Sequence, residues 1–143
     1  MARTDRIDAI ARDCIAVRLR RLARVVNALY DEELRPLGVG IGQLNVLVVT
    51  AKLGRARPAD VARFLAIERS TLSRNLERMR ARGWIAETGS VDARERPFEL
   101  TRAGRDLLAR AYPAWRRAQS AAERLVGAGG VRLLHEIAEP RAD

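Results

Sequence analysis

Apolar residues recur at helical spacing over most of the chain, and the pattern is clearest between residues 5 and 35. One stripe follows the alternating steps of four and three that are typical of a coiled-coil-like seam: Ile15, Leu19, Leu22, Val26 and Leu29. A second, neighbouring stripe consists of Ile7, Ile10, Cys14 and Val17. Because two apolar stripes exceed what one packing partner needs, the pattern predicts one long helix that packs partly against another subunit.

Three shorter helices are predicted after a proline- and glycine-rich break, "RPLGVGIG", at residues 35–42. The first runs from about residue 43 to 53, and the second begins at Pro58, a residue suited to a first helical position. The third is "ERSTLSRNLERMRARG", and Gly83 should end it as the residue that follows a helix C-cap. Since only the tight turn "AIE" separates the second helix from the third, the two form a predicted helix-turn-helix.

The apolar spacing changes after Gly83. "WIAET" and "PFELT" predict two short strands, and the polar stretch "GSVDARER" lies between them, so a winged helix is expected. Thr101 is the predicted N-cap of a last long helix over about 102–126, which should kink at Pro113. "GAGG" ends it, and a short final helix over 131–137 follows. The expected fold is therefore mostly α with a small antiparallel β-wing (α+β).

The third short helix has two faces when its residues are placed at intervals of about 100°. The side predicted to face inward carries Leu72, Leu76 and Met79. The first two turns of the remaining surface carry small hydroxyl residues and one arginine: Ser70, Thr71, Ser73 and Arg74. Small residues let a helix approach base edges, Arg74 can reach guanine O6 and N7, and Arg78 suits a backbone phosphate. Taken alone, this surface is better explained as a solvated charged face, with Glu77 paired to Arg74 or Arg80 along the helix.

The tip of the predicted wing supplies the context that favours nucleic acid. Arg94 and Arg96 are suited to a DNA minor groove, whose negative potential attracts arginine. Asp92 cannot favour DNA by its charge, so its expected role is to pair with an arginine and set the shape of the wing.

The charge balance agrees with a polyanionic partner. Against 18 acidic residues stand 27 basic ones, of which Lys52 is the only lysine, and the net charge is +9. Such an excess indicates a nucleic acid or an acidic membrane surface. A coding bias would explain arginine in place of lysine, but not the net excess. The alternating steps of the first helix suit a dimer interface better than a membrane surface.

Other function classes have less support. No nucleophile–base pair, carboxylate dyad or phosphate loop is visible, so no enzyme is expected. His135 has no cysteine or acidic cluster at ligand spacing, so no metal and no cofactor is predicted. One cysteine, no signal-peptide pattern and no long apolar run predict a cytoplasmic protein. The arginine excess also permits a non-specific DNA-architectural protein, which the hydroxyls of the third short helix disfavour.

Four motifs together resemble the MarR family of bacterial transcription regulators, and the resemblance covers most of the chain. They are Thr71-Leu72-Ser73-Arg74 in the third short helix, Gly83-Trp84-Ile85 at the first strand, Asp92-Ala93-Arg94 in the wing and Leu100-Thr101-Arg102-Ala103-Gly104 at the last helix. Any one of them alone is weak, but the combination is specific. The family's usual aspartate N-cap of the recognition helix is replaced by Glu68, which caps less well.

The resemblance implies a single MarR-type domain over residues 1–143. Its winged helix-turn-helix DNA-binding part would be 41–101, and 5–35 and 102–138 would be dimerisation helices. The family's pattern implies a homodimer, in most cases a repressor released from a palindromic operator by a small-molecule effector. It also implies major-groove contacts from Ser70, Thr71, Ser73 and Arg74, and a minor-groove contact from Arg94 braced by Asp92. Arg96 follows less directly, because the wing tip varies.

Cys14 raises one alternative within the family, a thiol-based sensor of oxidative stress. In the resembling peroxide sensors, two tyrosines polarise a cysteine near the start of the first helix. Here Tyr30 lies farther along than that pattern requires, and Ile41 and Leu44 stand at the second tyrosine-bearing segment. Cys14 also shares a stripe with apolar residues, so an unreactive buried cysteine is the favoured interpretation.

Overall fold

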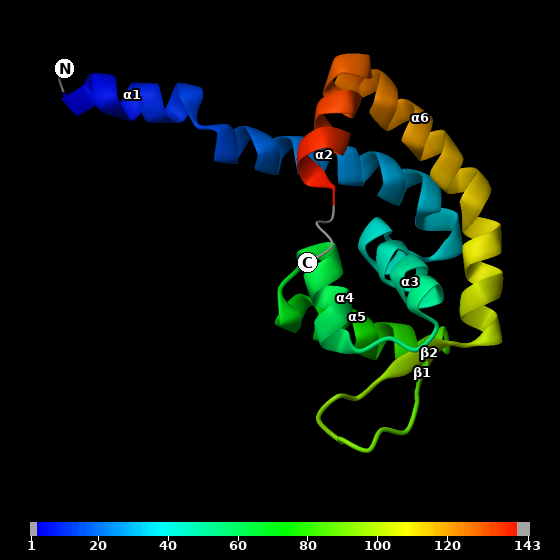
Figure 1. Cartoon of the computed structure of the whole chain (residues 1–143). Coiled ribbons are helices and arrows are strands. Elements are labelled where there is room, and N and C mark those ends of the chain that lie inside the picture. The colour runs from blue at the N-terminus through cyan, green and yellow to red at the C-terminus, as the bar shows by residue number, and fades with distance from the viewer. Residues whose placement is uncertain (1–2, 140–143) are drawn as a thin grey trace.

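The computed structural model describes residues 3–139, and residues 1–2 and 140–143 of the predicted domain lie outside them. Helices dominate, and the only sheet among the described residues is one antiparallel pair of strands, which confirms the predicted fold class (Figure 1). The elements in chain order are α1 (Arg3–Asp13), α2 (Ile15–Leu34), the 3-10 helix η1 (Arg35–Leu37), α3 (Ile41–Leu53), α4 (Pro58–Leu65), α5 (Arg69–Ala81), β1 (Ile85–Glu87), β2 (Phe98–Leu100) and α6 (Arg102–Ala138).

The core is centred on α3, which packs against α2, α4, α6 and β2 (Figure 1). Its buried residues are Leu44, Val46, Leu47, Val49 and Thr50. Because these residues surround most of the helix, α3 lacks the one-sided apolar stripe of a surface helix. The hydroxyl of Thr50 donates to the Val46 carbonyl oxygen at 2.7 Å, so this buried polar group is satisfied.

α2 and α6 lie side by side over part of their length (Figure 1). Two side-chain contacts link them: the Tyr30 hydroxyl donates to Gln119, and Arg117 pairs with Glu33 at 2.8 Å. The buried face of α6 carries Leu107 and four alanines, namely Ala111, Ala114, Ala118 and Ala122. Alanine side chains occupy little space at an interface, so they let a neighbouring helix approach closely.

The prediction of one continuous helix over 5–35 is wrong. The backbone leaves helical geometry at Cys14, with φ −64° and ψ 110°, and this residue separates α1 from α2. The Arg18 guanidinium donates to the freed Arg12 carbonyl oxygen. None of the α1 residues is buried within the chain, and the helix projects away from the rest of the molecule (Figure 1). No intrachain packing therefore holds α1 in line with α2.

The last helix bends at the glycine-rich segment that the sequence predicts as its end. Gly127 has φ 76° and ψ 160°, a conformation that favours glycine, and α6 turns back beyond it (Figure 1). Helical geometry resumes directly afterwards, three residues earlier than the predicted start at 131. Pro113 lies inside α6 and does not interrupt it, because the backbone leaves helical geometry only at Gly127; the kink expected at Pro113 stays a prediction.

The junction between the sheet and α6 depends on Thr101. Its side chain accepts a hydrogen bond from the Gly104 amide at 3.1 Å, so the predicted N-cap is confirmed. The same hydroxyl donates to the Gly83 carbonyl oxygen at 2.5 Å. One residue therefore caps α6 and ties its start to the end of the helix-turn-helix.

No single helix within residues 3–139 is both long and apolar enough to cross a membrane. Two consecutive helical segments, Arg3–Leu37 and Ile41–Leu53, reach the length and apolar composition of a membrane span only when they are counted together, and they are bent by 79° relative to each other.

Candidate nucleic-acid interface

The two predicted faces of α5 are present. Leu72, Leu76 and Met79 are buried in the core, as the helical spacing predicts. On the other surface, every predicted base-reading residue is exposed: Ser70, Thr71, Ser73 and Arg74. Arg78 is exposed one turn farther along. The helix is thus held by its inner side while a surface of hydroxyls and arginine stays accessible.

Local backbone signals set the limits of α5. Glu68 is the N-cap residue and makes no side-chain capping hydrogen bond, in line with the weak cap expected from glutamate. At the other end, Gly83 has φ 71°, its amide donates to the Arg80 oxygen at 2.9 Å, and the Trp84 amide donates to the Met79 oxygen at 3.0 Å. This pair of bonds is the Schellman arrangement, so Gly83 occupies the predicted position after the C-cap.

The turn before α5 and the wing after it complete the predicted winged helix-turn-helix. Ala66 adopts a left-handed conformation, φ 51°, which ends α4 and allows the tight turn into α5. β1 and β2 pair with Ile85 opposite Leu100 and Glu87 opposite Phe98. Ala56, just before α4, forms a bridge with Phe98 and adds a third short backbone segment beside the wing.

Asp92 organises the tip of the wing. Its Oδ1 accepts a hydrogen bond from the Arg94 amide at 2.9 Å and lies 3.4 Å from Arg94 Nε. The Arg94 side chain is 94% exposed, so this contact shapes the loop and leaves the guanidinium facing solvent. The geometry is the aspartate–arginine pairing expected from the sequence.

Arg96 is arranged differently from Arg94. Its guanidinium pairs with Glu87 Oε1 at 2.6 Å, and Arg80 Nη2 approaches the same oxygen at 3.1 Å. Arg80 comes from α5 and Glu87 from β1, so one carboxylate connects α5 to the wing. A DNA phosphate would have to compete with Glu87 for Arg96.

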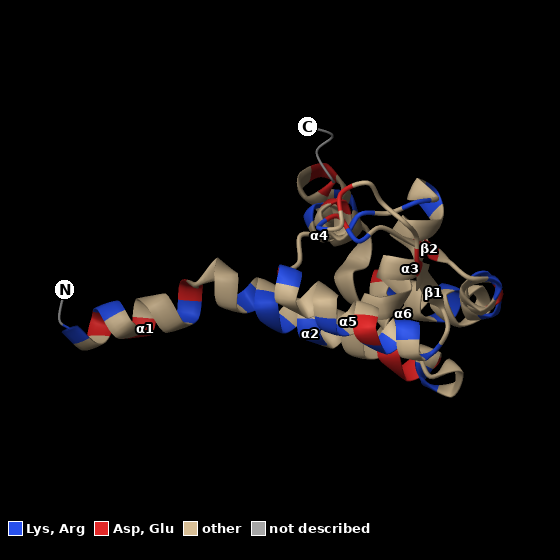
Figure 2. Cartoon of the chain, turned by 90° about the horizontal axis from the view of Figure 1, so that it is seen from below, with Lys and Arg blue, Asp and Glu red and all other residues tan. Residues whose placement is uncertain are grey.

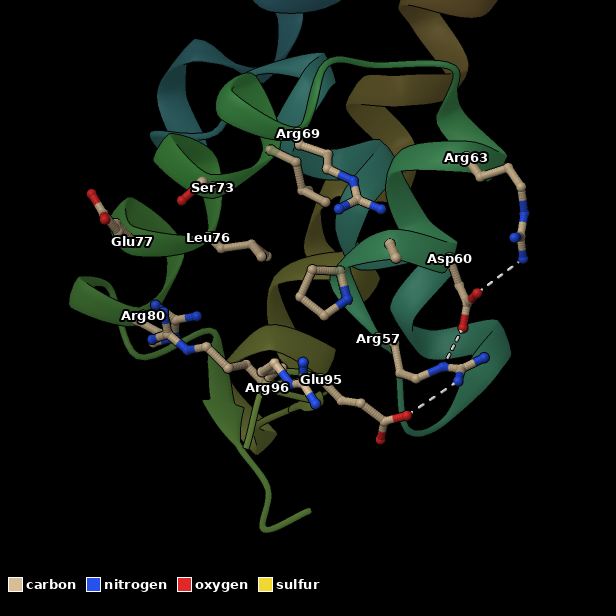
Figure 3. Close-up of a pocket in the computed structure, with 14 residues that line it drawn as sticks. Arg57, Asp60, Arg63, Arg69, Ser73, Leu76, Glu77, Arg80, Glu95 and Arg96 are labelled. Carbon is tan, nitrogen blue, oxygen red and sulfur yellow. Dashed lines mark hydrogen bonds and ion pairs between the residues drawn. The ribbon is translucent and has the colours of Figure 1, made fainter. Parts of the chain in front are cut away.

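A groove of about 550 Å³ lies between α4, α5 and the wing (Figure 3). Its charged lining includes residues for which the sequence predicts no role: Arg57, Asp60, Arg63, Arg69 and Glu95. Asp60 accepts from Arg57 Nε at 2.7 Å and from Arg63 at 2.9 Å, and Arg57 Nη1 reaches Glu95 at 3.4 Å (Figure 3). The R-x-x-D spacing in the sequence could have indicated the contact between Arg57 and Asp60. No sequence pattern indicates the contact between Arg57 and Glu95, because the two residues are 38 positions apart.

The electrostatic effect on Arg57 agrees with that geometry. The hydrogen bond that Arg57 donates to Asp60, followed by the charge of Asp60 and the contact with Glu95, raises the pKa of the Arg57 guanidinium. The guanidinium therefore stays charged under any physiological condition.

Positive charge is not confined to this interface. The middle of α2 is also strongly basic (Figure 2). Its exposed arginines are Arg18, Arg20, Arg21 and Arg24. The net charge alone therefore does not distinguish the surface of α2 from the surface formed by α5 and the wing.

Within the described chain, no group of three or more His, Cys, Asp or Glu residues is arranged to hold a metal ion. Cys14 lies at the break between α1 and α2 and is partly exposed. Tyr30 follows it by 16 positions, about 24 Å of helix rise, and its hydroxyl is bound to Gln119. This geometry does not favour the cysteine-sensor alternative.

The fold and the site define a winged helix-turn-helix protein of the DNA-binding type. Residues 37–95 match the model of the MarR family. The transcriptional regulator MosR of M. tuberculosis, solved in complex with DNA, is 36% identical; the alignment covers 88% of this chain and 92% of that one, with a TM-score of 0.78. The chain therefore belongs to the MarR family of transcription regulators, which are not enzymes.

Two further solved structures share the fold at lower identity. A mutant of E. coli MarR, complexed with operator DNA, is 18% identical; the alignment covers 91% of this chain and 94% of that one, with a TM-score of 0.79. Bordetella bronchiseptica BpsR, whose DNA binding is regulated by 6-hydroxynicotinic acid, is 22% identical; the alignment covers 88% of this chain and 94% of that one, with a TM-score of 0.77.

A curated protein of Bacillus subtilis, the HTH-type transcriptional regulator YwoH, is also similar in sequence. It is 26% identical over 84 residues, and the match spans 59% of this chain and 61% of YwoH.

Proposed function

We propose that the chain is a sequence-specific, DNA-binding transcription regulator that acts as a homodimer on a palindromic operator. The observation that carries the proposal is the exposed hydroxyl-and-arginine surface of α5, placed beside a wing whose Arg94 points into solvent. The DNA-binding part would be residues 41–101. The crystallised complexes of MosR with DNA and of E. coli MarR with operator DNA support this function.

The proposed contacts follow from side-chain chemistry. Ser70, Thr71 and Ser73 would approach base edges or phosphates in the major groove, and Arg74 would bind guanine. Arg78 would neutralise a backbone phosphate. Arg94 would enter the minor groove, with Asp92 holding the loop that presents it, and Arg96 would approach the backbone nearby.

The proposed homodimer would bury apolar residues that this chain leaves exposed. Those on α1 and α2 are Ile7, Ile10, Ile15, Val17, Leu19 and Val25. Those beyond the middle of α6 are Leu125, Leu133, Leu134 and Ile137. A concentration of exposed apolar side chains at both ends of one chain is typical of an interaction surface. Segments 5–35 and 102–138 are therefore proposed as dimerisation helices.

The regulator would be a repressor that a small molecule releases from its operator. The regulation of BpsR by 6-hydroxynicotinic acid supports a ligand-responsive mechanism in a protein of the same fold. No cofactor and no catalytic step is part of the proposal, and a regulator of genomic DNA would act in the cytoplasm.

A non-specific architectural protein is the second candidate. It would need only phosphate contacts, so the hydroxyls on the exposed surface of α5 favour the specific regulator over it. Selection of bound DNA from a random pool at one fixed salt concentration separates the two. A palindromic consensus is expected, whereas recovery of unrelated sequences at equal affinity would contradict the proposed specificity.

A further inference from the structure

Three consecutive residues before α4 are attached to the wing. The wing has two arms, a first one that follows β1 and a second one that leads into β2. The Arg55 guanidinium donates to the Gly89 carbonyl oxygen on the first arm. Ala56 and Phe98 exchange two backbone hydrogen bonds of 2.9 Å at the base of the second arm. Arg57 Nη1 lies 3.4 Å from Glu95 Oε1 near the tip. One short segment therefore contacts both arms.

Glu95 uses both carboxylate oxygens in this attachment. While Oε1 faces Arg57, Oε2 accepts a hydrogen bond from the Ser90 hydroxyl at 2.9 Å. Arg57 is itself held on α4, because Asp60 accepts from its Nε at 2.7 Å. Glu95 thus joins the two arms of the wing to each other. It also contacts Arg57 at the start of α4 (Figure 3).

The next residue of the wing attaches to the opposite side of the groove. Arg96, with φ 42°, pairs with Glu87, which also holds Arg80 of α5. Of these two neighbouring wing residues, Glu95 contacts Arg57 at the N-cap of α4, and Arg96 is linked to α5 only through Glu87. Arg94, the proposed minor-groove residue, directly precedes them in the chain.

We propose that the Arg57–Glu95 pair holds the wing in register with α5, so that Glu95 is a positioning residue for the minor-groove contact of Arg94. This inference rests on the proposed DNA-binding function. In this arrangement Arg57 binds Glu95 of the wing and does not contact a DNA phosphate. The pairing also gives a functional reason for an acidic residue, Glu95, on a surface that approaches a polyanion.

Loss of the Glu95 charge should change DNA affinity in the direction opposite to the one expected from charge repulsion alone. Removing a negative charge near DNA should by itself strengthen binding, because it reduces repulsion from the phosphates. If Glu95 positions the wing, Glu95→Gln should instead weaken binding, since the ion pair that holds the tip of the wing to Arg57 would be lost. The expected loss is about two- to fivefold, the scale of an exposed ion pair.

Glu77→Gln is the matched control. Glu77 lines the same groove from α5, is exposed, and makes no ion pair with any residue in the range 3–139. The same change of charge there should leave binding as tight as wild type or slightly tighter. Arg57→Gln should reproduce the loss seen with Glu95→Gln, because it breaks the same contact from the other side.

The test compares the full-length variants on the selected operator at one salt concentration. For Glu95→Gln, minor-groove footprints at the flanks should fade while protection of guanine N7 in the major groove remains. Amide hydrogen exchange of residues 88–96 in the free protein should accelerate for Glu95→Gln and not for Glu77→Gln.

Three results for Glu95→Gln would each overturn the inference. They are operator binding as tight as wild type or tighter, loss of both the minor-groove and the major-groove footprints, and unchanged amide hydrogen exchange of residues 88–96. A loss confined to Arg57→Gln would also overturn it, because Arg57 would then contact DNA directly. If the wild-type protein selects no preferred sequence, the proposed function fails, and the exchange comparison still decides whether the pair holds the wing.

Discussion

Gly104, in the first turn of α6, lies against the backbone of Trp84: a Cβ atom at Gly104 would come within 2.2 Å of the Trp84 carbonyl oxygen. The neighbour is backbone and not the end of a flexible side chain, so the contact cannot be relieved by a rotamer change. This close approach explains why the start of α6 reads L-T-x-x-G: Thr101 caps the helix, and Gly104 lets it reach the end of the helix-turn-helix.

Gly104→Ala should therefore destabilise the fold by about 1–3 kcal/mol, the usual cost of overpacking. Urea unfolding followed by circular dichroism measures it. Gly42→Ala is the control, because Gly42 lies in α3 and nothing is found within 4 Å of the position that a Cβ atom would take there. That variant should unfold within about 0.5 kcal/mol of wild type or be more stable, since alanine has the higher helix propensity. Equal losses in both variants would contradict the packing explanation.

Arg74 and Arg78 lie on the same exposed surface of α5 but should behave differently. Arg74→Ala should cost about 1–3 kcal/mol on the selected operator and relax base preference at one position in each half-site. Arg78→Ala should weaken specific and random DNA alike and reduce the salt dependence by about one phosphate contact. Titrations of both variants on both DNAs at several salt concentrations provide the comparison. Parallel losses on the two DNAs for Arg74→Ala would rule out base reading.

The exposed apolar residues of α1 predict a dimer that a single charge should disrupt. Ile10 is 69% exposed within one chain, so Ile10→Glu should shift the protein toward monomer and weaken operator binding. Val91, fully exposed at the wing, is the control, and Val91→Glu should leave the oligomeric state unchanged. Sedimentation equilibrium at several protein concentrations distinguishes the species. A dimer that persists in Ile10→Glu would place the interface elsewhere.

Tyr30 should make the stability of the fold depend on pH in the alkaline range. Burial, with a further contribution from the charge of Glu123, raises the pKa of the Tyr30 hydroxyl above its usual value near 10. The neutral hydroxyl is favoured in the folded state, so its contribution is complete below about pH 10 and is lost as pH rises through the folded-state pKa.

Tyr30→Phe should cost about 1 kcal/mol at about pH 8, because the hydrogen bond to Gln119 is lost. The difference from wild type should shrink above about pH 10. Tyr112→Phe, at an exposed ring, should show no comparable difference at either pH. The measurement is urea unfolding at about pH 8 and about pH 11, and a gap between Tyr30→Phe and wild type that widens with pH would contradict the sign.

Cys14 should not act as the switch for DNA release. Peroxide treatment of the wild-type protein and of Cys14→Ser should leave operator affinity equal, because Cys14 lies about 24 Å of helix rise from Tyr30 and Tyr30 is bound to Gln119. Thiol titration with and without DNA provides the accompanying measure of reactivity. Release of DNA by peroxide from wild type alone would restore the sensor alternative.

The features that can be predicted from the sequence are those decided by neighbouring residues. Helical spacing places Leu72, Leu76 and Met79 inside, and Gly83 and Thr101 mark helix ends through backbone conformation and side-chain capping. The Asp92–Arg94 contact is equally predictable, because its partners are two positions apart. Such features can be predicted because they are determined by the conformation of a few consecutive residues.

Features that join distant segments depend on the folded chain. The helix breaks at Cys14, and no residue of α1 is buried within the chain, neither of which the apolar spacing predicts. Glu95 meets Arg57 only after the wing folds against the start of α4. In the same way, Glu87 holds Arg80 and Arg96 because the β1–β2 register brings them together. The amino-acid order alone thus specifies most of the elements, their ends and the exposed surface of α5. The arrangement of the charged groups around that surface comes from the fold, because ion pairs between distant residues leave no periodic signal in the chain.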